Sequence, residues 1–135
     1  MSTILLGYVL TVFAIIGIDL AWLGLVAKPL YASELGTLLR KDPNLIAAGA
    51  FYLLYAAGLT QFAVLPGLKA GSVLQACGLG AALGLVAYGT YDLTNLSVIN
   101  GYTLRIALID IAWGVVSSTA VSGLVALAMA RSSAG

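Results

Sequence analysis

The chain has 135 residues, of which 61% are apolar and only 8% are charged. A soluble domain carries about 25% charged residues, so this composition excludes an ordinary water-soluble globular protein. The formal net charge of +1 gives no reason to expect nucleic acid as a partner. One cysteine and no histidine exclude an internal disulfide, histidine-bound zinc and bis-histidine haem, and we expect neither a metal nor a cofactor.

Four hydrophobic stretches are long enough for a membrane-spanning helix, which needs about 20 apolar residues. They cover approximately residues 3–27, 45–65, 72–96 and 103–130. Lys28-Pro29 and Pro66-Gly67 are predicted to end the first two, Asp42-Pro43-Asn44 to begin the second, and Asn100-Gly101 to separate the last two. A lipid-exposed backbone must form helices, so we predict an all-α four-transmembrane-helix bundle, with residues 1–135 as one membrane domain.

The first stretch has no basic segment before it and is too long for a cleaved signal peptide, so we expect it to be a mature helix. Residues 29–41, which follow it, are predicted to form a short amphipathic helix at the membrane interface. One stripe of that helix contains Tyr31, Leu35, Leu38 and Leu39, whereas other faces carry Glu34, Thr37 and Lys41. A short connecting turn is the alternative, because Gly36 weakens a helix.

The distribution of basic residues predicts the orientation in the membrane. The side that carries the first and third connections has four of them: Lys28, Arg40, Lys41 and Arg105. The side of the termini has two, Lys69 and Arg131. We therefore expect the first and third connections to face the cytoplasm and the termini to lie outside. Arg105 is interpreted as part of this pattern rather than as a partner of Asp110.

Three of the five acidic residues lie inside the predicted spans: Asp19, Asp92 and Asp110. A carboxylate in the bilayer costs about 2.5–3.5 kcal/mol on insertion scales, so each requires a partner or a function. Asp19 and Asp92 lie near the ends of the first and third spans, and Asp110 lies near the start of the fourth. A rise of about 1.5 Å per residue puts all three roughly 8–14 Å from the same membrane side.

Aromatic and polar side chains fall in the same layer, whereas the other half of the bundle carries little beyond Gln61 and some Ser and Thr. We predict a site centred on Asp92, whose candidate catalytic residues are Asp92, Asp19 and Asp110. Its candidate ligand-binding residues are Trp22, Tyr52, Tyr55, Tyr88, Tyr91, Asn95 and Trp113.

Helix periodicity predicts that residues of this site face the interior of the bundle. Gly80, Gly84, Tyr88, Asp92 and Asn95 form one stripe of the third span, where the Gly-x-x-x-Gly spacing favours close approach of a neighbouring helix. Asp-x-Ala-Trp occurs in both the first and the fourth span, and Tyr-x-x-Tyr in both the second and the third. This pattern indicates either symmetry within the site or coincidence.

These motifs carry a family resemblance. Asp19-x-x-Trp22-Leu23-Gly24, Phe51-Tyr52-Leu53-Leu54-Tyr55-Ala56, Ala87-Tyr88-Gly89-Thr90-Tyr91-Asp92-Leu93-Thr94-Asn95-Leu96 and Asp110-x-x-Trp113-Gly114 occur in order along nearly the whole chain. Together they resemble a family of small bacterial inner-membrane proteins known only as a domain of unknown function. The resemblance implies four helices and a bacterial inner membrane, and it implies no activity, cofactor or catalytic residue.

Several hypotheses remain open at this point. The Asp residues could only join helices by bonding Trp and Tyr side chains, and the Tyr residues could form an interfacial aromatic belt. A functional cluster could bind or modify an amphipathic, lipid- or isoprenoid-like ligand, with Asp side chains as general acid and base. It could instead serve a proton- or cation-coupled transporter that works as a homo-oligomer, or the protein could be a scaffold for a partner membrane enzyme. The one-sided polarity favours the amphipathic ligand, and membrane lipids are the expected partners.

Overall fold

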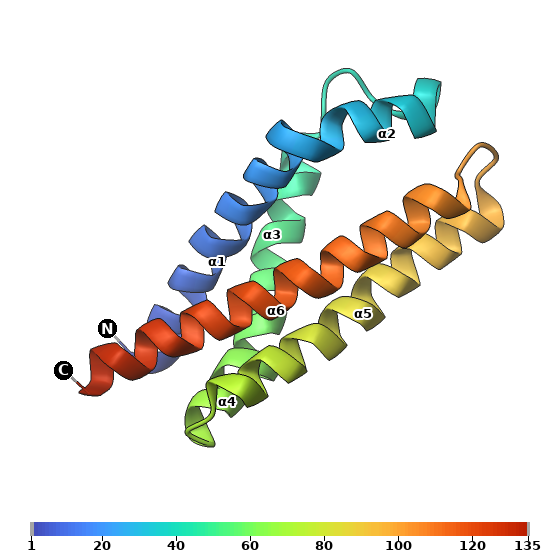
Figure 1. The fold of residues 1–135 in the computed structure, drawn as a ribbon. Coiled ribbons are helices and arrows are strands. Elements are labelled where there is room, and N and C mark those ends of the chain that lie inside the picture. Colours follow the sequence, from blue (N-terminus) through green and yellow to red (C-terminus); the bar gives the residue numbers. More distant parts are fainter. Residues whose placement is uncertain (1, 135) are drawn as a thin grey trace.

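The computed structural model describes residues 2–134, which form helices joined by short turns (Figure 1). Within that range, four helical segments are long and apolar enough to cross a membrane: Thr3–Leu38, Leu45–Lys69, Val73–Val98 and Leu104–Ser132. No strand occurs among these residues. The predicted all-α membrane bundle is confirmed.

The first span is longer than predicted because the helix continues through Lys28-Pro29. It consists of α1 (Thr3–Trp22), the π-helical turn η1 (Leu23–Ala27), α2 (Lys28–Leu35) and the 3-10 turn η2 (Gly36–Leu38). A proline ring clashes with the carbonyl four residues earlier in a regular α-helix. Here the wider turn η1 precedes the proline, and the N–H of Lys28 bonds the carbonyl of Leu23, five residues back. In Figure 1 the chain bends after α1, and α2 runs toward the end of the α5–α6 pair.

The second span also contains a π-helical turn before a proline. It contains α3 (Leu45–Leu59), η3 (Thr60–Val64) and α4 (Leu65–Lys69), so Pro66-Gly67 lies inside the helix and its predicted end at residue 65 is wrong. The N–H of Leu65 bonds the carbonyl of Thr60, again five residues back and again just before a proline. The predicted start is confirmed, since the side chain of Asn44 caps α3 by accepting a hydrogen bond from the N–H of Ala47.

The last two spans are the long helices α5 (Val73–Val98) and α6 (Leu104–Ala134). Ser72 caps α5 by accepting a hydrogen bond from the N–H of Gln75, and Thr103 accepts one from the N–H of Ile106 at the start of α6. The turn between them contains Gly101 with a φ of 85°, which confirms the predicted break at Asn100-Gly101.

α5 and α6 pack closely against each other. A Cβ added to Gly80 would lie 2.5 Å from the Oγ of Ser122, and one added to Gly84 would lie 2.4 Å from the carbonyl oxygen of Gly114. Only glycine permits this helix separation, so the predicted role of the Gly-x-x-x-Gly motif is confirmed.

The apolar core lies toward the termini, and the bundle opens toward α2. Ile15, Leu59, Val64 and Val121 are completely or almost completely buried in that core. α3 packs against α1, whereas η3 and α4 are the parts of the second span that pack on α5. In Figure 1, α1 and the α5–α6 pair diverge toward the α2 end. The divergence leaves room for a cavity at the depth predicted for the polar layer.

Candidate functional site

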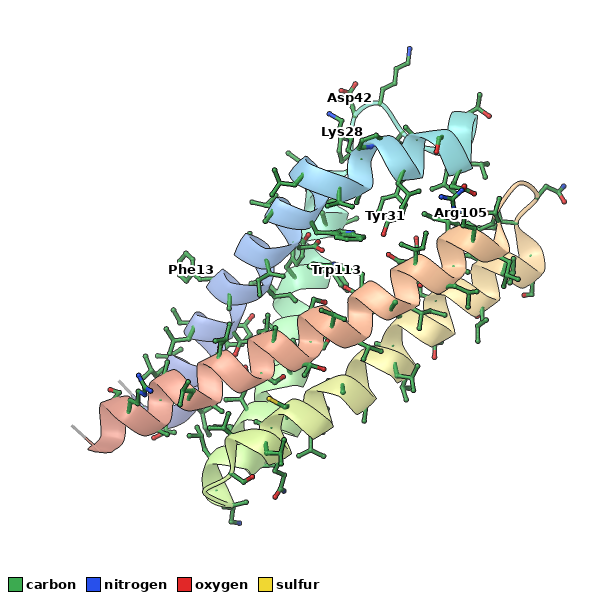
Figure 2. The ribbon with its side chains drawn as sticks, viewed as in Figure 1. Phe13, Lys28, Tyr31, Asp42, Arg105 and Trp113 are labelled. Atoms are coloured by element: carbon green, nitrogen blue, oxygen red, sulfur yellow. The ribbon has the colours of Figure 1, made fainter. Side chains whose placement is uncertain are left out.

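A cavity of about 630 Å³ lies between α1, α2, α3, α5 and α6. Its walls are formed by Asp19, Trp22, Leu23, Tyr31, Ala47, Ala48, Phe51, Tyr52, Ala87, Tyr88, Tyr91, Asp110 and Trp113. The two carboxyl groups come from α1 and α6, and the apolar part of the wall comes mainly from α3 and α5. Figure 2 shows Tyr31 pointing from α2 toward α6, and Trp113 between α6 and α1. The size is typical of a small-molecule site, for which volumes of about 300–1,000 Å³ are usual.

Asp19 is held by two donors from other helices. The indole N–H of Trp113 donates to its Oδ1 at 2.9 Å. The hydroxyl of Tyr52 donates a short hydrogen bond to its Oδ2. Both oxygens of this half-buried carboxyl therefore have a partner, and α1 is tied to α3 and α6 at the depth of the cavity.

Asp110 accepts a hydrogen bond from α2, the part of the first span that follows the bend. The hydroxyl of Tyr31 donates to its Oδ1 at 2.8 Å and accepts from the indole N–H of Trp22 at 3.4 Å. The carboxyl group of Asp110 also lies within hydrogen-bond distance of that of Asp92. Asp110 therefore connects the cavity, which it lines, to the carboxyl group of Asp92.

The two Asp-x-Ala-Trp motifs form one reciprocal unit. The Trp113 ring of α6 bonds Asp19 of α1, whereas the Trp22 ring of α1 reaches Asp110 of α6 through Tyr31. The two indole rings stack with centroids 4.5 Å apart and planes 7° apart. Each tryptophan of the repeated motif is therefore connected to the aspartate of the other helix, directly for Trp113 and through Tyr31 for Trp22.

Asp92 lies behind the cavity wall rather than at its centre, where it had been predicted. Its side chain is completely buried and its carboxyl group lies beside that of Asp110. The hydroxyl of Tyr102 donates to its Oδ1 at 2.5 Å, and its Oδ2 has no partner among the described residues. Burial, followed by the bond to Asp92, raises the pKa of the Tyr102 phenol, which therefore remains a donor.

The predicted tyrosines occupy different positions around the cavity. The ring of Tyr88 lies against Gly114, where an added Cβ would come within 2.2 Å of it, and it meets Tyr55 edge to face. Tyr55 lies behind the wall and shares a hydrogen bond of 2.6 Å with Ser118. Tyr91 lines the cavity but is 59% exposed. The inward positions of Tyr52, Tyr55 and Tyr88 do not fit an interfacial belt.

The contacts of α2 differ from the predicted amphipathic pattern. Glu34, which had been assigned to another face than Tyr31, also points toward α6. Its carboxyl accepts from Thr103 at 2.7 Å and meets Arg105 at 3.5 Å. Tyr31 and Glu34 are three residues apart and therefore share a face of α2. The prediction that Arg105 does not pair with Asp110 agrees with the structure, because Arg105 forms its ion pair with Glu34.

Seven of the ten predicted site residues line the cavity: Asp19, Trp22, Tyr52, Tyr88, Tyr91, Asp110 and Trp113. Asp92, Tyr55 and Asn95 lie outside its wall, and Asn95 lies beside Tyr91 and Tyr102. Tyr31 and Tyr102 were missed as site residues. Both lie next to the spans that the sequence predicted, where an aromatic residue is usually assigned to the interface.

These observations define an α-helical multi-pass membrane protein with a polar, aromatic cavity at one end of the bundle. The chain matches the model of the family described as Predicted membrane protein (DUF2177) over residues 4–127, and it belongs to that family. No curated protein and no solved structure matches it.

Proposed function

We propose that the protein binds an amphipathic, lipid- or isoprenoid-like ligand, with the polar head between Asp19 and Asp110 and the tail directed toward the membrane. The observation that carries this proposal is a cavity with acidic and aromatic walls at one end of an otherwise packed bundle.

A sideways entrance is supported by two residues that belong to both the cavity wall and the outer surface. Phe51 of α3 is 42% exposed and Tyr91 of α5 is 59% exposed, and both line the cavity. The small residues Ala47, Ala48 and Ala87 lie on the same two helices. An apolar tail passing between α3 and α5 would therefore meet small and aromatic side chains rather than charges.

The packed half of the bundle argues against a transport pathway through the monomer. Thr11, Ile15, Leu59 and Ser118 are at most 1% exposed there, and none of them lines the cavity. A transporter needs access to its site from both membrane faces. The one-sided cavity suits a ligand that enters and leaves through the lipid.

The hydrogen bonds of Asp19 and Asp110 would also serve a purely structural role. Such bonds contribute only about 0.6 kcal/mol on average in a membrane protein, which is small beside the cost of an intramembrane acid. A structural role also has no use for a cavity of about 630 Å³ beside the two carboxyl groups. The cavity is the feature that favours binding.

The proposal includes a location in the bacterial inner membrane, with the cavity at the cytoplasmic end and the termini outside. It is supported by the excess of Lys and Arg near α2 and the α5–α6 turn over the other side.

Mass spectrometry of molecules retained by the purified protein tests this function. The Ala48→Leu variant fills the cavity wall, and Ala57→Leu makes the same change at an exposed α3 position outside it. We expect one amphipathic species to be enriched with the wild type and with Ala57→Leu, and lost with Ala48→Leu. If no species is enriched with any of the three, ion- or proton-coupled transport in liposomes becomes the better hypothesis.

A further inference from the structure

We infer that the ligand headgroup is a protonated amine, recognised by Asp110 with Asp92 behind it and by the aromatic walls of the cavity. This inference rests on the proposed function and specifies the chemistry of its polar end.

The charges around the cavity select against an anion. Two carboxyl groups line it and the third, Asp92, lies behind Asp110, whereas no Lys or Arg is among the lining residues. Arg105, near the start of α6, is paired with Glu34, and its side chain is 71% exposed. A phosphate or carboxylate headgroup would face these acids without a compensating cation, in surroundings where charge interactions are weakly screened.

Unsatisfied acceptors show what kind of group fits. Asp19 already accepts a hydrogen bond at each oxygen, from Trp113 and Tyr52. By contrast, Asp110 accepts from one hydroxyl, that of Tyr31, and its carboxyl group lies within hydrogen-bond distance of the buried carboxyl group of Asp92. The Oδ2 of Asp92 receives no N–H or hydroxyl donor from residues 2–134. A buried acceptor without a donor is costly, and more so when the group is charged. An ammonium group in the cavity brings up to three N–H donors and a positive charge to Asp110, and Asp92 behind it adds a second acidic group to the same side of the ligand.

The walls around these acids add a second, independent feature. Trp22, Trp113, Tyr52, Tyr88 and Tyr91 line the same cavity. Aromatic rings attract cations through their negative faces, most strongly where water is excluded. Acids surrounded by several aromatic rings are a suitable environment for an amine. A single metal ion suits the site less well, since no cluster of three or more ligating side chains exists among the described residues.

Tryptophan fluorescence offers a direct test, because the chain has two tryptophans and both line the cavity. We would titrate the purified protein in maltoside micelles with four amphiphiles that share a twelve-carbon chain: dodecylamine, dodecyltrimethylammonium, dodecanol and laurate. We expect dodecylamine, which is protonated at neutral pH, to saturate the change in emission at a concentration at least about tenfold below those of dodecanol and laurate. Dodecyltrimethylammonium is charged but has no N–H donor, so its saturating concentration should lie between that of dodecylamine and those of dodecanol and laurate.

Variants separate binding in the cavity from partition into the micelle. Asp110→Asn should remove the preference for dodecylamine, whereas Asp42→Asn makes the same charge change at an exposed loop position and should retain it. Equal or tighter binding of dodecanol or laurate to the unmodified protein would overturn the amine assignment and leave the amphiphile site intact. If no amphiphile changes the emission, and if mass spectrometry finds the same retained molecules with Ala48→Leu as with the wild type, the proposed function itself fails. The headgroup series does not depend on the folding of any variant.

Discussion

Replacement of Gly84 by alanine tests whether the contact between α5 and α6 sets the geometry of the site. The added Cβ would lie 2.4 Å from the carbonyl oxygen of Gly114, about 1 Å short of the 3.4 Å at which ordinary contact begins. It would also lie 2.8 Å from the Oγ of Ser118. Because one of the obstacles is backbone, the helices must separate by roughly the missing distance. Overpacking of this kind costs about 1–3 kcal/mol.

Gly78→Ala is the matched control. Gly78 lies on the same helix, and an added Cβ there meets nothing within 4 Å. Both substitutions gain about 1 kcal/mol of helix propensity, so this contribution cancels in the comparison. We expect Gly84→Ala to unfold with a free energy about 1–3 kcal/mol below that of Gly78→Ala. The measurement is unfolding by dodecyl sulfate in mixed micelles, followed by tryptophan fluorescence. Equal stability of the two variants would refute the argument that glycine is required for this helix separation.

Three further predictions concern the site itself. Asp92→Asn should leave the unfolding free energy within about 1 kcal/mol of the wild-type value, because an amide still accepts from Tyr102. It should abolish ligand retention, because it removes the carboxyl group that lies beside Asp110; a variant that fails to insert or fold would make Asp92 structural. Tyr31→Phe should destabilise the contact of α2 by about 1–3 kcal/mol, since Asp110 loses a donor, and faster amide hydrogen exchange confined to α2 would measure this. Gly114→Ala should displace the Tyr88 ring and weaken retention of the ligand more than Gly84→Ala does; unchanged retention would show that this ring does not shape the site.

The depth of the polar layer was predictable because helix rise is constant. Counting residues from the ends of the spans placed Asp19 and Asp110 at one level, and both line the cavity. The 3.6-residue period similarly placed Gly80, Gly84 and Asp92 on one face of α5, and all three are buried. The transmembrane segments were recognisable from composition alone, because a bilayer accepts few charges.

Proline was a misleading signal for helix ends in this chain. Pro29 and Pro66 both lie inside helical segments, each after a π-helical turn in which the preceding residue bonds a carbonyl five residues back. Single-sequence rules treat proline as a terminator because its ring clashes in a regular α-helix. Neighbouring helices can stabilise the wider turn, and the sequence pattern carries no sign of it.

The sequence by itself determined that this is a four-helix membrane protein with three acids at one depth, since composition, helix rise and helix period depend only on the chain. The tertiary structure alone decided which side chains meet across the helices. In the folded protein, Asp92 lies behind Asp110, and Tyr31 of α2 donates a hydrogen bond to Asp110. A cavity lies where α1 and the α5–α6 pair diverge. These features depend on crossing angles and on the bend before Pro29, which arise from packing between distant segments and leave no local signature in the sequence.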